Sequence, residues 1–240
     1  MRFESKAQAR RHVWDLLEAE QFAQSPLPAH GRIPNFVGAE AAAARLFEQS
    51  PWREAVTLKI NPDSPQRAVR LMALARGVRV YVPTPRLTDG FHLLDPQRIP
   101  AHAFDAAATL QSMREHSILV PLRELPAFDA IVTGCVAVTA SGKRCGKGAG
   151  YSDIEFGILR ELGFDAVPVA TTVHEAQIVA DFPVESNDLP LTLICTPQRS
   201  LFVANPMAAP GGVEWERLSA ADIERMPLLA ELRALKEEAR

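Results

Sequence analysis

Four glycines and three cations stand close together between residues 142 and 150. They are Gly142, Gly146, Gly148 and Gly150, with Lys143, Arg144 and Lys147. Glycine lets a backbone approach a ligand closely with its N–H groups turned inward. The segment lies between an apolar run and an expected helix, whose positive dipole end favours anions. This pattern predicts a phosphate-binding loop, although a basic surface turn without a ligand is the alternative. The loop lacks the Gly-Lys-Ser/Thr ending of a Walker A loop and does not match Gly-x-Gly-x-x-Gly.

Two aspartates are candidate ligands for Mg²⁺. Asp153 lies just inside the helix expected after the loop, where a carboxylate could bind a Mg²⁺ that bridges phosphates. Asp188 lies just before an expected strand, a position that often faces the site in open α/β folds. The alternatives without a metal are that Asp153 is an aspartate favoured by the helix dipole in a first turn, and that Asp188 is an ordinary turn residue. His174 and Glu175 could form a catalytic pair, but no further metal-ligand spacing supports a histidine site.

Lys6 and Arg10 are four residues apart, so they project from one face of the helix expected over residues 5–20. Two like charges on one face repel each other unless an anion lies between them. The alternative is a solvated face, since Arg11 and His12 add charge to neighbouring faces of the same helix.

The elements that must position these residues alternate between helix and strand. Ser5 is the expected N-cap of the first helix, and Gly77 and Gly163 are expected to end later ones. Proline- and glycine-rich sequence predicts loops over 25–38 and 83–100. Helices are expected over residues 5–20, 39–48, 65–76, 102–116 and 152–162 and from Ser219, and strands over 55–60, 78–82, 130–134, 136–138, 166–170, 191–196 and 200–204. This alternation predicts βαβ units and a mostly parallel sheet.

Composition limits the class of protein. The 240 residues are 47% hydrophobic and 23% charged, with a net charge of −3, which predicts a globular protein without a global basic field for nucleic acid or anionic lipid. We expect one α/β domain over residues 1–240, with 213–240 as a C-terminal helical extension. No signal-peptide pattern or membrane-length apolar run is present, and three widely spaced cysteines form no zinc or disulfide pattern. We therefore expect a cytoplasmic protein that binds a small molecule and no membrane, and we leave its oligomeric state open.

Together these segments resemble the 5-formyltetrahydrofolate cyclo-ligase family, also called methenyltetrahydrofolate synthetase. The resemblance runs from Lys6 to about Pro197, and the glycine loop ending in Tyr-x-Asp is its most specific element. The matching segments are Lys6-x-x-x-Arg10, Val82-Pro83, Arg144–Asp153 and Glu185–Asp188. Residues 30–38, 82–87 and 148–153 look like a divergent branch, the methenyltetrahydrofolate synthetase domain-containing proteins, some of which have been linked to thiamine metabolism.

The resemblance implies a three-layer α/β/α fold with a mostly parallel sheet, like that of sugar-phosphate isomerases and CoA transferases. It also implies a ligase of one-carbon metabolism. With ATP and Mg²⁺, the family phosphorylates the formyl oxygen of 5-formyltetrahydrofolate; N10 then attacks and phosphate leaves, which gives the 5,10-methenyl product. Phosphorylation turns a poor leaving group into a good one, so the enzyme must mainly position the reactants and stabilise charge.

The resemblance also implies roles for individual residues. The expected catalytic residues are Lys147, Arg144 and Tyr151, and the expected Mg²⁺ ligands are Asp153 and Asp188. The substrate is expected to contact Asp63, Pro83, Thr84 and Tyr151. ATP binding is assigned to Lys6, Arg10, Arg144, Gly146, Lys147, Gly148, Gly150 and Asp153.

The chain departs from the family pattern, which usually reads Gly-x-Gly-Lys-Gly-Tyr-Tyr-Asp-Arg. Ala149 replaces the lysine, Ser152 the second tyrosine and Ile154 the arginine. Losing the lysine from a buried site could cost ~2–5 kcal/mol, unless Lys147 compensates. The stretch 117–121, where a folate-stacking tryptophan is expected, has no aromatic residue, and the family's pocket glutamate aligns near Asp63.

The ATP half of the expected site is therefore better preserved than the pterin half. We predict cyclo-ligase activity and keep two alternatives. One is an ATP-dependent enzyme that acts on another small heterocycle or N-formyl compound, such as a thiamine-related one. The other is a non-catalytic protein that binds a ligand or a partner.

Overall fold

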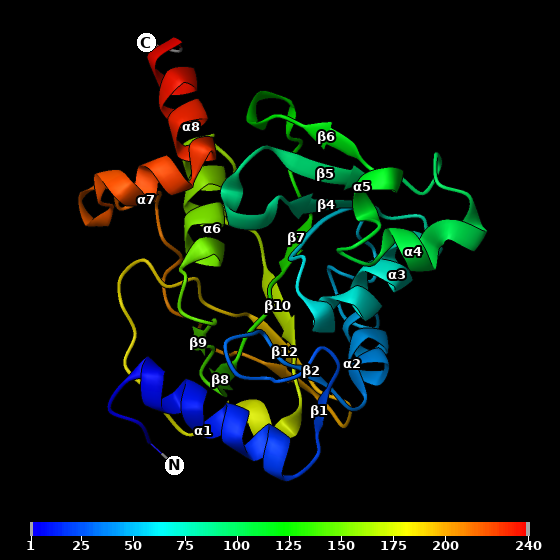
Figure 1. Cartoon of the computed structure of the whole chain (residues 1–240), viewed down its shortest axis with the longest axis vertical. Helices are drawn as coiled ribbons and strands as arrows, with labels where there is room; N and C mark the ends of the chain where they lie inside the picture. The colour runs from blue at the N-terminus through cyan, green and yellow to red at the C-terminus, as the bar shows by residue number, and fades with distance from the viewer. Residues whose placement is uncertain (1, 239–240) are drawn as a thin grey trace.

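The computed structural model describes residues 2–238 and contains one eight-stranded sheet between two groups of helices (Figure 1). The five central strands run parallel, and the strands at the two edges of the sheet are antiparallel to their neighbours. The α/β prediction with a mostly parallel sheet is therefore confirmed. In spatial order the strands are β13 (Ser200–Phe202), β12 (Leu193–Cys195), β10 (Val169–Thr172), β7 (Ala130–Val132), β3 (Thr57–Ile60), β4 (Arg79–Pro83), β5 (Phe91–Leu94) and β6 (Ile118–Val120).

Helices cover both faces of this sheet and complete the three layers. On one face lie α2 (Ala39–Leu46), α3 (Arg67–Ala75) and α4 (Phe104–Ala107), whose apolar side chains share a core with β3 and β4. On the other face lie α6 (Tyr151–Glu161) and α8 (Pro227–Glu238), which share a second core with β7 and β10. Figure 1 shows these two groups on opposite sides of the sheet.

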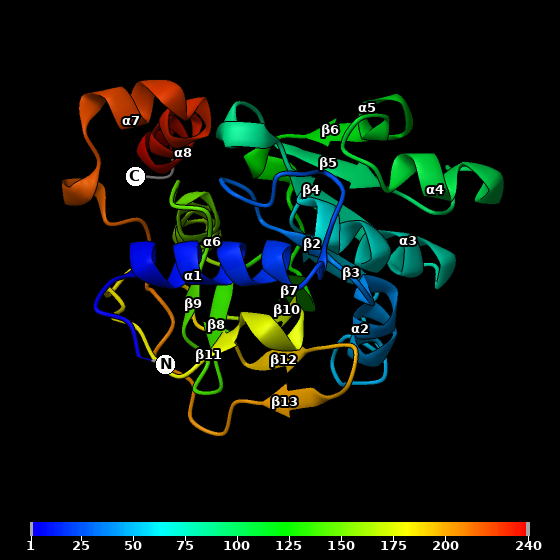
Figure 2. The same cartoon turned by 60° about the horizontal axis from the view of Figure 1, so that its bottom comes forward.

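The first helix packs on a second, smaller sheet. This sheet contains β11 (Ile178–Val179), β8 (Ala137–Thr139) and β9 (Arg144–Cys145). Helix α1 (Lys6–Ala19) lies across it, as Figure 2 shows, and buries Ala9, Val13 and Leu17, which recur every four residues on one face. Ser5 caps the helix as predicted, since its hydroxyl oxygen accepts a hydrogen bond from the backbone of Gln8.

The remaining elements are short. They comprise a two-stranded sheet of β1 (Ala23–Gln24) and β2 (Asn35–Phe36), the helices α5 (Met113–His116) and α7 (Ala220–Arg225), and the 3-10 helices η1 (Ser64–Gln66), η2 (Pro85–Leu87), η3 (Ala101–Ala103), η4 (Leu122–Glu124), η5 (Glu175–Gln177) and η6 (Trp215–Arg217).

The order of the parallel strands creates a crevice. The chain passes from β3 to its neighbour β4 on one side, and later returns to place β7 on the other side of β3. The loops that leave the carboxyl ends of β3 and β7 therefore diverge. In open α/β sheets, ligands bind in the crevice at such a switch in strand order.

Two predicted elements differ from the structure. The helix predicted over 102–116 is broken into η3, α4 and α5, because the Thr109 hydroxyl donates to the Ala106 carbonyl and accepts from the Ser112 backbone N–H. The loop predicted over 83–100 contains β5, which pairs with β4 after a turn at Asp89 and Gly90. Local turn residues marked this hairpin, but only its pairing with β4 makes Phe91–Leu94 a strand.

The C-terminal segment is helical as predicted and packs on α6. Leu228, Leu229 and Leu232 of α8 are buried in the core that α6 shares with the sheet. The single domain over 1–240 stays a prediction, and residues 239–240 lie outside the described residues. None of the helices within residues 2–238 has the length and hydrophobicity that crossing a membrane requires.

Candidate functional site

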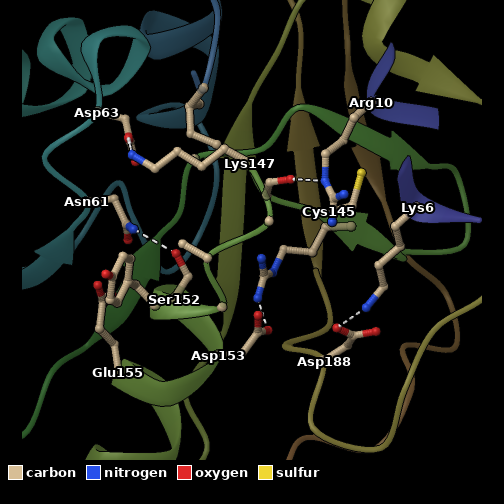
Figure 3. Close-up of a pocket in the computed structure, with 18 of the residues that line it drawn as sticks. Lys6, Arg10, Asn61, Asp63, Cys145, Lys147, Ser152, Asp153, Glu155 and Asp188 are labelled. Carbon is tan, nitrogen blue, oxygen red and sulfur yellow. Dashed lines mark hydrogen bonds and ion pairs between the residues drawn. The ribbon is translucent and has the colours of Figure 1, made fainter. Parts of the chain in front are cut away.

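A cleft of about 780 Å³ opens where β3, β7 and β4 end (Figure 3). Asn61 to Asp63 follow β3, Gly134 follows β7 and Thr84 follows β4, and all of these residues line the cleft. The cleft therefore lies at the switch in strand order, and its volume is typical of small-molecule sites. The start of α1, the glycine loop, the start of α6 and the loop at 183–188 form its other walls.

Lys6 and Arg10 reach this cleft because α1 packs on the strands that precede the glycine loop. The Lys6 ammonium lies 2.5 Å from the Asp188 carboxylate. The Arg10 Nε donates a hydrogen bond of 2.7 Å to the carbonyl of Gly146. Charge repulsion between the two cations is thus relieved by a carboxylate and a carbonyl of the chain itself, and both cations line the cleft.

The glycine loop forms the wall beside these cations. Gly148 and Gly150 have φ angles of +110° and +71°, a region that favours glycine, and Gly150 is the N-cap of α6. A Cβ on Gly148 would lie only 3.6 Å from the Arg10 guanidinium carbon, so the loop passes directly against this side chain. The first glycine and lysine of the segment do not belong to this wall. Gly142 forms the β8–β9 turn, and Lys143 pairs with Asp181 at 2.6 Å.

Arg144 and Asp153 form a buried ion pair at the base of the loop. The Arg144 side chain, on β9, is 3% exposed and donates to the Asp153 carboxylate and to the Leu189 carbonyl. The Leu189 backbone N–H donates to the same Asp153 oxygen. Burial disfavours the arginine charge, but neighbouring groups, first among them the Asp153 carboxylate, together outweigh it and raise the pKa of Arg144.

Asp153 and Asp188 have the donor chemistry that Mg²⁺ prefers. Both residues line the cleft, and the two Asp188 oxygens accept from the Lys6 ammonium and from the Glu185 N–H. The buried Oδ1 of Asn187, next to Asp188, has no hydrogen-bond partner in the described residues. Within residues 2–238 no cluster of three or more histidine, cysteine, aspartate or glutamate side chains could hold a metal alone. One or two carboxylates completed by phosphate oxygens and water are, however, the usual Mg²⁺ environment in nucleotide sites. The donor set therefore fits Mg²⁺ bound together with phosphates.

The residues predicted for the substrate lie mostly at the other end of the cleft. Asp63, Thr84 and Tyr151 line it, and Asp63 lies 3.6 Å from the Lys147 ammonium. Pro83 is buried at the end of β4 and is not among the residues that line the cleft, so its contact with the substrate stays a prediction. It is the last residue of β4, where it stands opposite Phe91 in the pairing with β5.

Two other predicted features lie away from the cleft. Residues 117–121, where a stacking side chain was expected, contain the edge strand β6, and none of them lines the cleft. His174 and Glu175 do not form a catalytic pair. His174 caps η5, and Glu175 pairs with Arg199 at 2.9 Å.

A buried polar network, which was not predicted from the sequence, lies under the cleft. The Lys59 ammonium on β3 donates to the Glu155 carboxylate on α6 and, at 2.7 Å, to the Asn61 side-chain oxygen. The Asn61 Nδ2 donates to the Ser152 hydroxyl at 2.9 Å. Burial raises the pKa of Glu155, although Lys59 opposes this shift. A lysine inside an apolar strand was the available signal, because a buried lysine requires a partner.

Arg70 is a second missed residue and positions the wall after β3. It is 1% exposed, on α3, and donates to the backbone carbonyls of Asn61, Asp63 and Ala108. Burial lowers its pKa to about 9, which leaves it protonated at neutral pH. A buried cation thus fixes the loop that carries Asn61 and Asp63.

The cysteine in the loop is not activated. Cys145 is buried in β9, and burial raises the pKa of its thiol. All three cysteines are free and buried.

A cleft lined by cations and carboxylates at the switch of a parallel sheet, beside a glycine loop and a helix N-terminus, defines an α/β protein with a candidate anion-binding site. The model of the 5-formyltetrahydrofolate cyclo-ligase family matches residues 2–197, and the chain belongs to this family.

Curated relatives agree with this membership, and a solved structure has a similar fold. The chain is 36% identical over 242 residues to the methenyltetrahydrofolate synthase domain-containing protein of Bos taurus and 34% identical to that of Homo sapiens. Each match covers 98% of this chain but only 63% of the relative's length. The NMR structure of Aquifex aeolicus 5,10-methenyltetrahydrofolate synthetase is 15% identical, with a TM-score of 0.51 over 85% of this chain and 95% of that one. That structure supports the fold.

Proposed function

We propose that this chain is an ATP- and Mg²⁺-dependent cyclo-ligase that converts 5-formyltetrahydrofolate to 5,10-methenyltetrahydrofolate. The observation that carries the proposal is the convergence of four cations on one cleft. Lys6 and Arg10 come from the first helix, and Arg144 and Lys147 come from a segment more than a hundred residues later. Cations beside a helix N-terminus, together with carboxylates that can hold Mg²⁺, favour a polyphosphate ligand that binds with Mg²⁺.

The residues of the cleft divide between its two ends. Lys6, Arg10 and the backbone of residues 146–150 would bind and orient the ATP phosphates. Lys147 is half exposed and lies between the glycine loop and Asp63, so its ammonium is free to move onto a transferring phosphoryl group. Asp153 and Asp188 would hold Mg²⁺, which when bound neutralises phosphate charge. Arg144 would keep the Asp153 carboxylate oriented.

The substrate would occupy the end lined by Asp63, Thr84 and Tyr151. Leu110 and Ile33 supply apolar surface there, and the Asp63 carboxylate is an acceptor for N–H groups of a heterocycle. The formyl oxygen must then lie in line with the γ-phosphate, because phosphoryl transfer depends mainly on positioning. We propose the cytoplasm as the place of this reaction.

One observation favours a second candidate. Tyr151 is the one aromatic residue among the described residues that line the cleft, and Ala149 stands where the family pattern has lysine. A nitrogen heterocycle or N-formyl compound smaller than a pterin needs less aromatic surface to stack on. An ATP-dependent enzyme acting on such a substrate would therefore need fewer aromatic residues in its cleft. This second candidate function uses the same ATP site and differs only in the substrate that binds at the other end of the cleft.

The proposal is tested by incubating the purified chain with 5-formyltetrahydrofolate, ATP and Mg²⁺ and following the absorbance of the methenyl product. We expect ATP-dependent turnover that Asp153→Asn removes and that Arg11→Ala, on the exposed face of α1, leaves unchanged. ATP binding without turnover would favour the second candidate. Absence of both binding and turnover would refute both and favour a non-catalytic role.

A further inference from the structure

A chain of hydrogen bonds runs beneath the cleft and ends at Ser152. It begins at Glu155 on α6, which accepts from the Lys59 ammonium on β3, and continues through Asn61 to the Ser152 hydroxyl. Lys59 and Glu155 are 1% and 4% exposed, whereas Ser152 is partly exposed and lines the cleft. Figure 3 shows Asn61 and Ser152 facing each other across the start of α6.

The donors and acceptors along this chain fix its direction. The Lys59 ammonium has only donors, so the Asn61 atom that faces it must be the oxygen. The Asn61 Nδ2 group, which also has only donors, therefore faces Ser152, and the serine oxygen must accept. As a result, the hydrogen of the Ser152 hydroxyl is left free. Among residues 2–238, this hydroxyl donates no hydrogen bond.

The surroundings of this hydroxyl favour an anion as its acceptor. Ser152 lies in the first turn of α6, immediately after the glycine loop, and the positive end of the helix dipole points there. Across the described residues, the backbone N–H groups of Tyr151 and Ser152 also have no acceptor. Lys147 and Arg144 line the same cleft. Three free donors and two cations thus meet at the start of one helix.

We propose that the Ser152 hydroxyl donates to a phosphate oxygen of the ligand, and that Glu155, Lys59 and Asn61 are positioning residues that hold it in this direction. The inference rests on the proposed function, because it assigns the group that the phosphates contact. It also gives a role to a departure from the family pattern, since Ser152 stands where that pattern has its second tyrosine. The buried ion pair orients the asparagine rather than contacting the ligand.

The test measures the affinity of Mg·ATP, and separately of inorganic pyrophosphate, by isothermal titration calorimetry. We expect Ser152→Ala to weaken binding about tenfold or more, the effect of losing a hydrogen bond to a charged acceptor. Ser152→Thr keeps the hydroxyl and should bind nearly as the parent protein does. Both substitutions are at a partly exposed position, so the variants should fold.

Asn61→Asp tests the direction of the chain. A carboxylate has only acceptors, so the Ser152 hydroxyl must turn toward residue 61 and withdraw from the ligand. Asn61→Asp weakens the affinity by some factor, and this factor should be about tenfold smaller when Ser152 is already alanine. The reason is that the two changes remove the same hydrogen bond to the ligand. Repulsion between the new carboxylate and the phosphates is present in both backgrounds and cancels. If Asn61→Asp does not fold, Asn61→Ala replaces it, and its smaller loss must likewise disappear in the Ser152→Ala background.

Three outcomes would overturn the inference. Unchanged affinity in Ser152→Ala removes the hydroxyl from the site, and equal losses of Asn61→Asp in both backgrounds remove the positioning role. Failure of the parent protein to bind either probe overturns the inference together with the proposed function. Binding of pyrophosphate without ATP refutes only the proposed function, and the Ser152 variants are then judged with pyrophosphate.

Discussion

Replacing Arg10 by alanine should weaken nucleotide binding much more than it weakens the fold. The guanidinium donates to the Gly146 carbonyl through Nε and lies against Gly148, which leaves its terminal nitrogens for a ligand. Loss of the bond to a neutral carbonyl should lower the free energy of unfolding by about 0.5–1.5 kcal/mol. Loss of a charge-assisted bond to phosphate should cost about 1.5–3 kcal/mol of binding, or roughly 10- to 150-fold in affinity for Mg·ATP.

The matched control is Arg11→Ala on the same helix. Arg11 is exposed and does not line the cleft, so its loss changes the net charge equally without removing a contact. Calorimetric titration with Mg·ATP measures the affinity, and thermal unfolding measures the stability. Equal affinities of the two variants would refute the reasoning, because only general charge would then matter. Arg10→Lys should fall between them, since it keeps the charge and loses the planar fork.

Further changes test other parts of the site. Asp153→Asn should abolish ATP-dependent turnover, which the absorbance of the product measures. It should also lower the free energy of unfolding by about 3–5 kcal/mol, because it leaves the buried Arg144 charge without its partner. Denaturant unfolding measures this second effect. Ala149→Lys should raise cyclo-ligase turnover if the missing loop charge limits the reaction, as steady-state kinetics would show. Burial lowers the pKa of His174 from 6.5, so the unfolded chain binds this proton more readily. The stability that neutral His174 contributes is thus present above pH 6.5 and is lost as the pH falls below it, and His174→Asn should flatten this slope in unfolding curves.

Each of these expectations has a clear contrary result. Unchanged turnover in Asp153→Asn would remove Asp153 from the metal site. No gain in Ala149→Lys would assign the limiting defect to the substrate end of the cleft. An unaltered slope below pH 6.5 in His174→Asn, whose side chain can still accept from the Ala176 N–H, would assign the pH dependence to other groups.

The central elements of the fold were predictable because they carry strong local signals. Ser5 marks the start of α1, Gly77 and Gly163 have the positive φ expected at helix ends, and apolar runs mark the parallel strands. Edge strands were not predictable in the same way. The residues of β5 become a strand by pairing with β4, and those of β6 by pairing with β5, and no short window of sequence contains these partners.

The site was predictable where one segment carries several functional groups, as in the glycine loop. The sequence also suggested that Lys6 and Arg10 share a face of α1, but their proximity to Gly146 depends on packing of α1 on β8 and β9. The glycine-rich segment also included Gly142 and Lys143, and the sequence alone does not reveal that a hairpin turn separates these two residues from the cleft.

The buried polar network could not be predicted from the sequence because its partners are far apart in the chain. Lys59 and Glu155 are separated by 96 residues and meet only when α6 packs over β3. Arg70 is similar, since its role depends on three carbonyls that surround it in the folded chain. A charged residue in an apolar element indicates that a partner exists without identifying it.

The most direct test of the central claim is a crystal structure of the chain with Mg·ATP. We expect the triphosphate to lie between the Arg10 guanidinium and the backbone of residues 146–150, within reach of Ser152, with Mg²⁺ beside Asp153 or Asp188. A nucleotide bound elsewhere, with Arg10 still turned only to the Gly146 carbonyl, would contradict it.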